Sequence, residues 1–468
     1  MTKKAHHKNA FLEAADYGEV EIVREKLENN LCEVDCQNEG GFTALMYAVA
    51  SYQKEIVESL ISHKCNPNLQ NNEGETALMI AVAKGYNDMI EVLVAHNCSL
   101  DLQNNKGETA LMIAVRFGRT DIVEALLAHN CKLDLQDNKG GTALIHVATK
   151  GYKDMFNLLV VHNCNLDLQN NKGETALIRA AYSSHRHIVN ALLAHNCKID
   201  SQDNAGWTAL MHAVGKRDKT IVDVLISYRC NPDLQNNEGE TALILAAVNG
   251  DKGIVEALVA HNCKLDLKDI DGWNVLMWAA GNGHKEIAEI LVAHKCNLDL
   301  QNNSGNNALM VAAYNGHKDI VDVLVAHKCN LDLQGNSGWS ALMRAACEGH
   351  KNIVEALVAH NCRLDMQNNK GETASIIARN SSHVEIAVSI ENQIRWNRNW
   401  QHRKALMLVL TGSNYLLPSS SLISPPPPPP ADSRRAVVSQ QRVDATLTTS
   451  SEKVLCDMFL VQHIMRYI

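Results

Sequence analysis

Cysteine is the first residue type in this 468-residue chain whose chemistry and spacing call for an explanation, because thiols can bind zinc or form disulfides. Most of the cysteines lie 33 residues apart, at Cys32, Cys65, Cys98, Cys131, Cys164, Cys197, Cys230, Cys263, Cys296, Cys329 and Cys362. Stacked helices of successive repeats lie ~8–10 Å apart, which is too wide for a disulfide or for two thiolates sharing one zinc ion. We therefore interpret this column as small buried side chains that pack a core. Cys32 and Cys36 form a C-x3-C pair without histidines nearby in the sequence, so we predict no metal site there either.

Histidine forms a second column with the same period. Its members are His63, His96, His129, His162, His195, His261, His294, His327 and His360, with Tyr228 in the sixth place. Each is expected in the last turn of the second helix of its unit, where a partly protonated imidazole complements the negative helix end. A side chain present in nearly every repeat indicates a scaffold role, because a catalytic site needs one special place. A column of metal ions is excluded by the same distance argument.

No sequence motif for catalysis or cofactor binding is present. The chain has no glycine-rich phosphate loop, no G-x-S-x-G turn and no H-E-x-x-H. Carboxylates such as Asp101, Asp134, Asp167 and Asp266 recur from repeat to repeat, which indicates architecture. We therefore expect no enzyme activity, no cofactor and no bound metal.

A repeat of 33 residues must position all these side chains. Its turn glycines are Gly41, Gly74, Gly107, Gly140, Gly173, Gly206, Gly239, Gly272, Gly305, Gly338 and Gly371, with no insertion between them. We name each unit by its turn glycine. A fixed period over this many units predicts a solenoid, in which each unit buries its apolar face against its neighbours.

The Gly74 unit shows the elements of one repeat. Residues 71–74 form a turn whose glycine allows a positive φ, and Thr76 is a natural N-cap for a short helix over 77–83. Gly85 ends this helix and reverses the chain. The apolar residues of 89–94 have the 3.6-residue period of a second helix.

That second helix closes at His96 and Asn97, because asparagine tolerates the left-handed conformation. Residues 98–103 alternate as an extended arm into the next turn. Each unit is therefore predicted to be a turn, a helix, a tight reversal, a second helix and an extended arm.

This pattern resembles the ankyrin repeat, which has a period of 33 and the signature T-P-L-H-x-A. The signature occurs here as Thr76-Ala-Leu-Met-Ile-Ala81 and again as Thr109-Ala-Leu-Met-Ile-Ala114. Alanine replaces the usual proline, and methionine replaces the usual histidine, both of which keep the helix start. The resemblance implies an all-α repeat solenoid of about eleven helix-turn-helix units, joined by β-hairpin-like loops into a curved stack.

The resemblance covers residues 8–395, with degenerate first and last units as caps. Residues 1–7 are expected to be a disordered tail, and residues 396–417 to form a capping helix. Residues 418–451 are rich in serine, threonine and proline, and are expected to be a solvated linker. Residues 452–468 have the spacing of an amphipathic helix, which faintly resembles the opening helix of an F-box-like segment.

Residues that depart from the average unit are the candidates for binding. Glutamate is the commonest residue after the turn glycine, and four units carry an aromatic residue instead: Phe42, Trp207, Trp273 and Trp339. Further departures lie along the first helix and at its end, at Arg116, Phe117, His146, Arg179, Tyr182, His212, Trp278, Tyr314 and Arg344. Tryptophan, tyrosine and arginine are enriched in binding hot spots. The resemblance places these positions beside the concave groove where the family binds partners, and packing against the adjacent hairpin is the alternative interpretation.

Charge and hydropathy exclude other classes of partner. The chain has a net charge of −8, and because residues 392–468 carry nine Lys/Arg and four Asp/Glu, the remainder stands at −13. Such a body repels a phosphate backbone, so nucleic-acid binding is not expected. No apolar run approaches the ~20 residues of a membrane span, and no secretory signal opens the sequence. Together with the cysteine content, this predicts an intracellular, cytoplasmic or nuclear, monomeric protein.

The leading hypothesis is a non-enzymatic scaffold that binds a partner protein in the concave groove. The alternative is a two-ended adaptor, whose C-terminal helix recruits effector machinery such as a ubiquitin ligase. The six prolines Pro425–Pro430 could dock in an SH3-, WW- or profilin-like partner, or act as a spacer.

Overall fold

The computed structural model describes residues 3–410, with side chains for residues 7–401. This part of the chain consists of 24 helices and no strands, arranged as successive pairs. The first helices of the pairs are α1 (Lys3–Tyr17), α3 (Ala44–Ala50), α5 (Ala77–Lys84), α7 (Ala110–Arg116), α9 (Ala143–Lys150), α11 (Ala176–Tyr182), α13 (Ala209–Gly215), α15 (Ala242–Asn249), α17 (Val275–Asn282), α19 (Ala308–Asn315), α21 (Ala341–Glu348) and α23 (Ala374–Asn380). The second helices are α2 (Val20–Glu28), α4 (Lys54–Ser62), α6 (Asn87–Ala95), α8 (Thr120–Ala128), α10 (Lys153–Val161), α12 (Arg186–Ala194), α14 (Lys219–Ser227), α16 (Lys252–Ala260), α18 (Lys285–Ala293), α20 (Lys318–Ala326), α22 (Lys351–Ala359) and α24 (Val384–Leu410).

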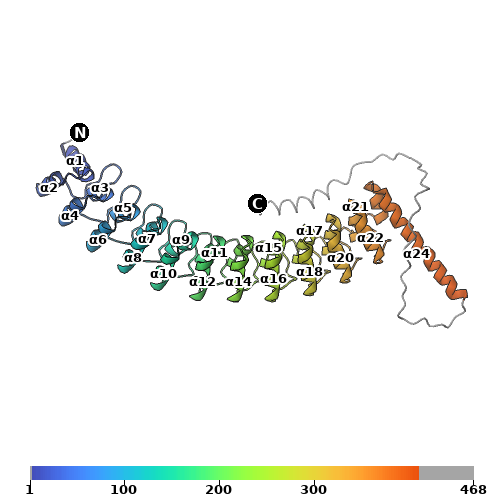
Figure 1. The fold of residues 1–468 in the computed structure, drawn as a ribbon. Helices are drawn as coiled ribbons and strands as arrows, with labels where there is room; N and C mark the ends of the chain where they lie inside the picture. Colours follow the sequence, from blue (N-terminus) through green and yellow to red (C-terminus); the bar gives the residue numbers. More distant parts are fainter. Residues whose placement is uncertain (1–2, 411–468) are drawn as a thin grey trace. The chain divides into compact units, whose positions relative to one another are not determined.

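The helix pairs stack in two rows. Each first helix packs against the first helix of the next unit, and second helices pack against second helices, so that the rows run side by side (Figure 1). The expected all-α repeat solenoid is therefore confirmed.

The caps that the sequence predicts for the Gly74 unit are present. The Thr76 Oγ1 atom accepts a hydrogen bond of 3.3 Å from the Met79 amide, and α5 ends at Gly85 with a φ of 81°. Asn97 takes a φ of 57° directly after α6. The Nδ1–H of His96 donates a 2.8 Å hydrogen bond to the Val92 carbonyl in the last turn of α6, so the imidazole closes the helix as expected.

Hydrogen bonds between side chains and backbone join each hairpin-like loop to the next. The Gln70 Nε2 atom donates to the carbonyl of Gly74 in its own loop, at 2.6 Å, and to that of Gln103 in the next, at 2.8 Å. Asp101 accepts a 2.8 Å hydrogen bond from the amide of Lys132, which lies 31 residues later. Both bonds recur along the solenoid, which explains why glutamine and a carboxylate return in nearly every unit.

The core is built from small and aliphatic side chains. In the Gly74 unit, Leu78, Ile90 and Leu93 are buried, and Cys98 lies beside them. The cysteines of the described residues are free thiols, and the eleven-member column is buried except for Cys32. The interpretation of these cysteines as packing residues agrees with this burial.

The two ends of the solenoid differ from the sequence-based expectation. Helix α1 begins at Lys3 and so includes most of the predicted tail 1–7, because no glycine or proline in residues 3–9 stops the helix of 10–17 from extending backwards. At the other end, α24 continues without a break from Val384 to Leu410, where a boundary near residue 395 was expected. Residues up to Ile394 form one compact unit, and a second begins at Arg395. Residues 411–468, including the predicted linker, the prolines and the C-terminal helix, lie outside the described residues.

Candidate functional site

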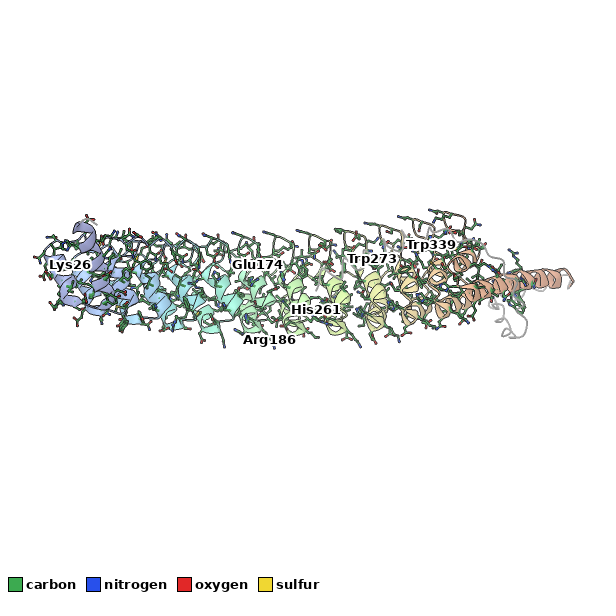
Figure 2. The ribbon with its side chains drawn as sticks, turned by 90° about the horizontal axis from the view of Figure 1, so that it is seen from above. Lys26, Glu174, Arg186, His261, Trp273 and Trp339 are labelled. Carbon is green, nitrogen blue, oxygen red and sulfur yellow. The ribbon has the colours of Figure 1, made fainter. Side chains whose placement is uncertain are left out.

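Three positions of each unit carry the residues that depart from the repeat, apart from Phe117, which lies one residue beyond the third. We call them the hairpin position (directly after the turn glycine), the mid-helix position (five residues later) and the helix-end position (three residues after that). In the Gly206 unit they hold Trp207, His212 and Gly215. The hairpins and first helices that carry these positions form one continuous surface of the solenoid, the hairpin–helix surface. Figure 2 labels Glu174, Trp273 and Trp339 along the edge that the hairpins form.

Each aromatic residue at a hairpin position packs on the mid-helix residue of its own unit. Ring centroids lie 5.4 Å apart for Phe42 and Tyr47, and 5.2 Å apart for Trp207 and His212. Trp273 and Trp278 lie at 4.9 Å. In the Gly338 unit, a guanidinium replaces the second ring. All four hairpin aromatics are half-buried, so each packs on its own unit and keeps part of its side chain exposed.

Space for the tryptophans comes from small residues at the helix end. A Cβ atom on Gly215 would lie 3.4 Å from Cζ3 of Trp207, and one on Gly281 would lie 3.6 Å from Cζ3 of Trp273. The indoles therefore extend across the first helix toward its C-terminal end. A larger residue at the helix end would exclude them.

The loop residue four before the hairpin position changes with the mid-helix residue. Where the mid-helix residue has a ring N–H, the loop carries aspartate: Asp137 bonds His146, Asp203 bonds His212 and Asp269 bonds Trp278, each at 2.9 Å. Where the hairpin position holds glutamate, the loop carries asparagine, which donates to that carboxylate in the pairs Asn71–Glu75, Asn104–Glu108, Asn170–Glu174, Asn236–Glu240 and Asn368–Glu372. The loop residue thus matches the hydrogen-bonding character of its partner.

Tyr182 is the centre of a cluster that crosses from one unit to the next. The Lys216 Nζ atom lies 4.0 Å from its ring centroid, and the Arg179 Cζ atom lies 5.1 Å away. The His212 imidazole meets the same ring edge to face at 5.7 Å. Because His212 also stacks on Trp207, five side chains of two units form one assembly, in which Tyr182 remains 41% exposed.

A second cluster lies toward the C-terminal end of the solenoid. The Arg344 guanidinium carbon lies 5.1 Å from the Trp339 ring and 5.8 Å from the Tyr314 ring of the preceding unit. Its Nη2 atom also donates to the Asn306 side chain at 3.4 Å. The arrangement again joins two units.

Arg116 and Phe117 form a smaller pair at the end of α7. The guanidinium carbon lies 5.0 Å from the ring centroid, and Nη1 is 3.2 Å from Glu108. Phe117 is 49% exposed, which is more than Tyr182 at 41%.

Arg179 and Glu174 form a shielded ion pair within the Tyr182 cluster. Arg179 Nη1 lies 3.1 Å from Glu174 Oε1, with the carboxylate buried. Burial acts to raise the pKa of Glu174, but the Asn170 amide and the Arg179 guanidinium outweigh burial, and this pKa lies below its ordinary value.

Trp278 is a correction to the predicted set. Only 6% of it is exposed, and its indole is held between Trp273 and Asp269, so it cannot contact a partner. Large aromatic residues in a first helix can pack as well as bind, and the sequence does not distinguish the two.

The chain matches the family model of ankyrin repeats, taken three copies at a time, in overlapping segments that together extend from residue 2 to residue 399. The chain belongs to the ankyrin-repeat family. Ankyrin repeats are a protein–protein interaction module, and that coarse function follows from the family.

No curated protein matches the sequence. Among solved structures, the ankyrin chain is similar to the crystal structure of the ankyrin repeat domain of Bcl-3, titled a unique member of the IkappaB protein family. That likeness has 26% identity and a TM-score of 0.44, and it covers 47% of this chain and all of the other.

The sequence analysis missed a histidine column at the interfaces of the ankyrin units. The Nε2–H groups of His185, His317 and His350 donate hydrogen bonds of 3.0 to 3.1 Å to carbonyls of the preceding unit. A Cβ atom on Gly316 of that unit would lie 2.7 Å from His350, so the imidazole occupies space that only glycine leaves. The Gly-His dipeptides at 316–317 and 349–350 were the available signal, whereas His185 follows a serine.

Lys216 was also missed. It lies one residue beyond the helix-end position, and its role depends on the ring of another unit. Sequence spacing within one unit does not show this contact.

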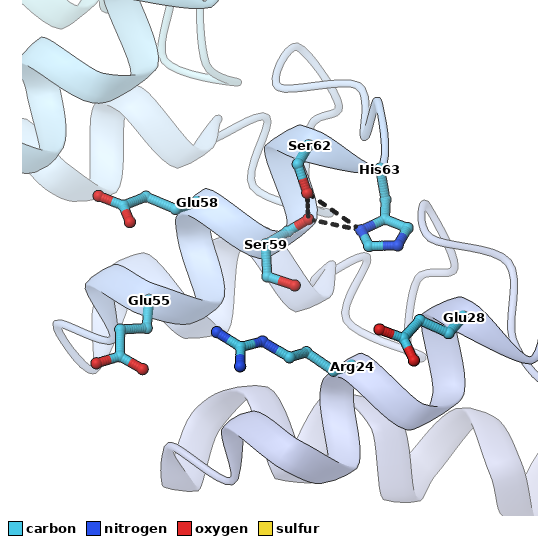
Figure 3. Close-up of a pocket in the computed structure, with 7 residues that line it drawn as sticks. All are labelled: Arg24, Glu28, Glu55, Glu58, Ser59, Ser62 and His63. Carbon is cyan, nitrogen blue, oxygen red and sulfur yellow. Dashed lines mark hydrogen bonds between the residues drawn. The ribbon is translucent and has the colours of Figure 1, made fainter.

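A shallow polar pocket lies between the second helices of the first ankyrin units (Figure 3). Ser62 and His63 lie in it, but the Ser62 hydroxyl donates to the Ser59 carbonyl at 2.7 Å, and the His63 Nδ1 lies 2.9 Å from the same carbonyl. The imidazole is therefore held by the helix end, as in other units. This geometry does not provide an activated serine.

Within residues 7–401, no group of three histidine, cysteine or acidic side chains is arranged to hold a metal ion. Burial raises the pKa of the column thiols. At Cys131, burial and the nearby Asp101 carboxylate together raise the pKa to about 12. These thiols are neutral at physiological pH.

No helix between residues 3 and 410 is both long and apolar enough to cross a membrane.

Proposed function

We propose that this ankyrin solenoid is a non-enzymatic scaffold that binds a partner protein on its hairpin–helix surface. The observation that carries the proposal is the Tyr182 cluster, in which side chains that break the repeat are joined across two units and leave an aromatic ring exposed. A ring already fixed by Lys216, Arg179 and His212 loses little side-chain entropy on binding. Aromatic residues of this kind commonly dominate interface energies.

The remaining proposed contact residues lie on the same surface. They are Phe42, Arg116, Phe117, His146, Arg179, Trp207, His212, Trp273, Tyr314, Trp339 and Arg344. The aromatic residues at hairpin positions pack on their own units and remain partly exposed. Support for binding comes from this combination of fixed geometry and partial exposure.

The test uses exposed residues, because removing a half-buried tryptophan also removes packing. Partners captured by the full chain are identified by mass spectrometry, and binding of the purified partner is then measured. We expect the double substitution Phe117→Ala and Tyr182→Ala to weaken binding at least ~tenfold, about 1.4 kcal/mol.

A matched control removes exposed apolar side chains from the second-helix side. Val161 is 76% exposed and Tyr228 is 46% exposed, so Val161→Ala with Tyr228→Ala should leave the affinity unchanged. Equal loss in both variants, or no loss in either, would reject the surface assignment. Thermal unfolding of both variants checks that the fold is kept.

The alternative adaptor role depends on residues 452–468, which lie outside the described residues. Deleting these residues should leave binding at the hairpin–helix surface intact. Loss of an effector on the same deletion would support the adaptor.

A further inference from the structure

Charge on the hairpin–helix surface changes along the solenoid. The residues before three successive turn glycines are the exposed lysines Lys106, Lys139 and Lys172. The corresponding residues of the later units are Ala205, Glu238, Asp271, Ser304, Ser337 and, in the last unit, Lys370. Hairpin tips are thus basic in the Gly107 to Gly173 units and acidic in the Gly239 and Gly272 units.

The ends of the first helices change in the same direction. Helix α9 ends at Lys150 and α13 is followed by Lys216, both exposed. Helices α15, α17 and α19 end at asparagine, and α21 ends at glutamate. If these lysines served only to complement the negative ends of the helices, lysines would be expected at the first-helix ends of early and late units alike. The helix dipole alone therefore does not explain why the early units carry lysine and the late units do not.

Five lysines of this region are available to a ligand. None of Lys106, Lys139, Lys150, Lys172 and Lys216 forms an ion pair with a carboxylate of the described residues. We call these five lysines the basic stretch. The exposed aromatic residues Phe117 and Tyr182 of the proposed binding surface lie in the same run of units, and Lys216 contacts the Tyr182 ring.

Carboxylates near the basic stretch are already engaged within their own units. Glu108 is bonded by Asn104 and paired with Arg116, and Glu174 is paired with Arg179. Asp137 is likewise bonded to His146. These bonds hold the negative groups in place. Lys172 also helps to lower the pKa of Glu174 and Lys216 contacts the Tyr182 ring, but neither ammonium group is held in an ion pair.

We propose that the basic stretch binds an acidic segment of the partner protein. The inference rests on the proposed function and names the chemistry of the ligand that fits this part of the surface. An extended segment rises ~3.3 Å per residue, so about twelve residues span the ~40 Å of four stacked units. Alternate carboxylates then reach the hairpin lysines on one side and the helix-end lysines on the other, where Tyr182 and Phe117 also lie.

An acidic peptide fits better than a nucleic acid. The region beyond the basic stretch carries Glu238 and Asp271, and residues 1–391 as a whole have a net charge of −13. A phosphate chain that continues along the solenoid would meet these carboxylates. A short acidic peptide segment ends before them.

The test measures fluorescence anisotropy of labelled probes with the purified full-length chain. The probes are a Glu-Gly repeat peptide of about twelve residues, a Lys-Gly peptide of the same length and an oligothymidylate of matched charge. We expect the Glu-Gly peptide to bind tightest, and its affinity to fall with added salt because the attraction is electrostatic. The double substitution Lys150→Glu and Lys216→Glu should weaken its binding at least ~tenfold.

A charge-matched control separates local recognition from net charge. Lys132 and Lys198 are exposed lysines of the same region that lie on the extended arms after the second helices. The substitution Lys132→Glu with Lys198→Glu should change the affinity by less than ~twofold. Equal loss in the two variants, tighter binding of the oligothymidylate, or no binding of the Glu-Gly peptide would each overturn the proposal. If the partner still depends on Phe117 and Tyr182 in such a case, the binding surface stands and only its charge preference is wrong.

Discussion

The indole Nε1–H of Trp278 donates a 2.9 Å hydrogen bond to the buried Oδ2 atom of Asp269. Asp269 also accepts the amide of Trp273 at 2.8 Å, so one carboxylate fixes both the loop and the first helix. Burial raises the pKa of this carboxyl above its ordinary value, although the Trp278 hydrogen bond acts in the opposite direction. The surrounding donors therefore offset only part of the cost of burying this charge.

Asp269→Asn should destabilise the solenoid more than Asp203→Asn. An indole N–H can only donate, so the new amide would place a donor against a donor, at a cost of about 1–3 kcal/mol. The His212 imidazole that faces Asp203 can accept the amide hydrogen through its other tautomer, so that change should cost less than about 1 kcal/mol. Urea unfolding of both variants measures the difference. Equal midpoints would mean that the Trp278 hydrogen bond contributes nothing.

Gly206→Ala should destabilise the fold more than Gly371→Ala. Both glycines have positive φ, near 80°, where alanine costs about 1–2 kcal/mol. A Cβ atom on Gly206 would also lie 2.8 Å from the Asn237 amide nitrogen, whereas one on Gly371 meets nothing within 4 Å. The difference between their unfolding midpoints therefore measures the contact between neighbouring hairpins. A larger loss for Gly371→Ala would contradict this account.

The substitution Gly215→Ala should keep or raise stability, and Gly215→Leu should lower it. The first change removes a helical glycine at a gain of up to about 1 kcal/mol, and its Cβ would lie 3.4 Å from Trp207, in ordinary contact. Leucine would instead displace the indole from the first helix. Thermal unfolding tests the sign of each change, and the leucine variant is expected to lose partner binding if Trp207 contributes to it.

Stability should fall as the pH rises above about 9. The pKa of the buried thiols is raised from the ordinary 9.0 to about 12, for example at Cys164, Cys197 and Cys263, chiefly by burial. Because the pKa is higher in the folded state, the stabilisation is present below pH 9 and is lost as the unfolded thiols ionise. At pH 10, each such thiol loses about 1.4 kcal/mol relative to neutral pH. Urea midpoints at pH 7.5 and above pH 9 measure the effect, and Cys197→Ala should reduce it.

The regular part of the fold could be predicted from the sequence because each of its signals is local. Thr76, Gly85 and Asn97 act within their own unit, and their spacing alone sets helix starts and ends. The same reasoning placed the cysteines in the core. In the first unit, no glycine or proline precedes residue 10 to mark where the helix begins. The start of α1 at Lys3 was therefore not predicted.

The candidate site could be predicted only in part. The hairpin and helix-end outliers were found by comparing units, but their environment depends on neighbours in space. Trp278 is buried because Asp269 and Trp273 enclose it, and Lys216 belongs to the cluster because Tyr182 precedes it by one unit. Contacts of this kind join residues that no periodicity within one unit connects.

The glutamine bond from each loop to the next has the same form at Gln70, Gln136 and Gln334, and even the exceptional Lys268 donates to the carbonyl 33 residues ahead. Because this hydrogen bond is the same between every pair of neighbouring loops, it does not depend on which two units are adjacent. Recombination could therefore remove or duplicate whole units, and the loops that become neighbours would still form this hydrogen bond. Descendants of this gene should differ in length by multiples of 33 residues, and changes of any other size should be rare.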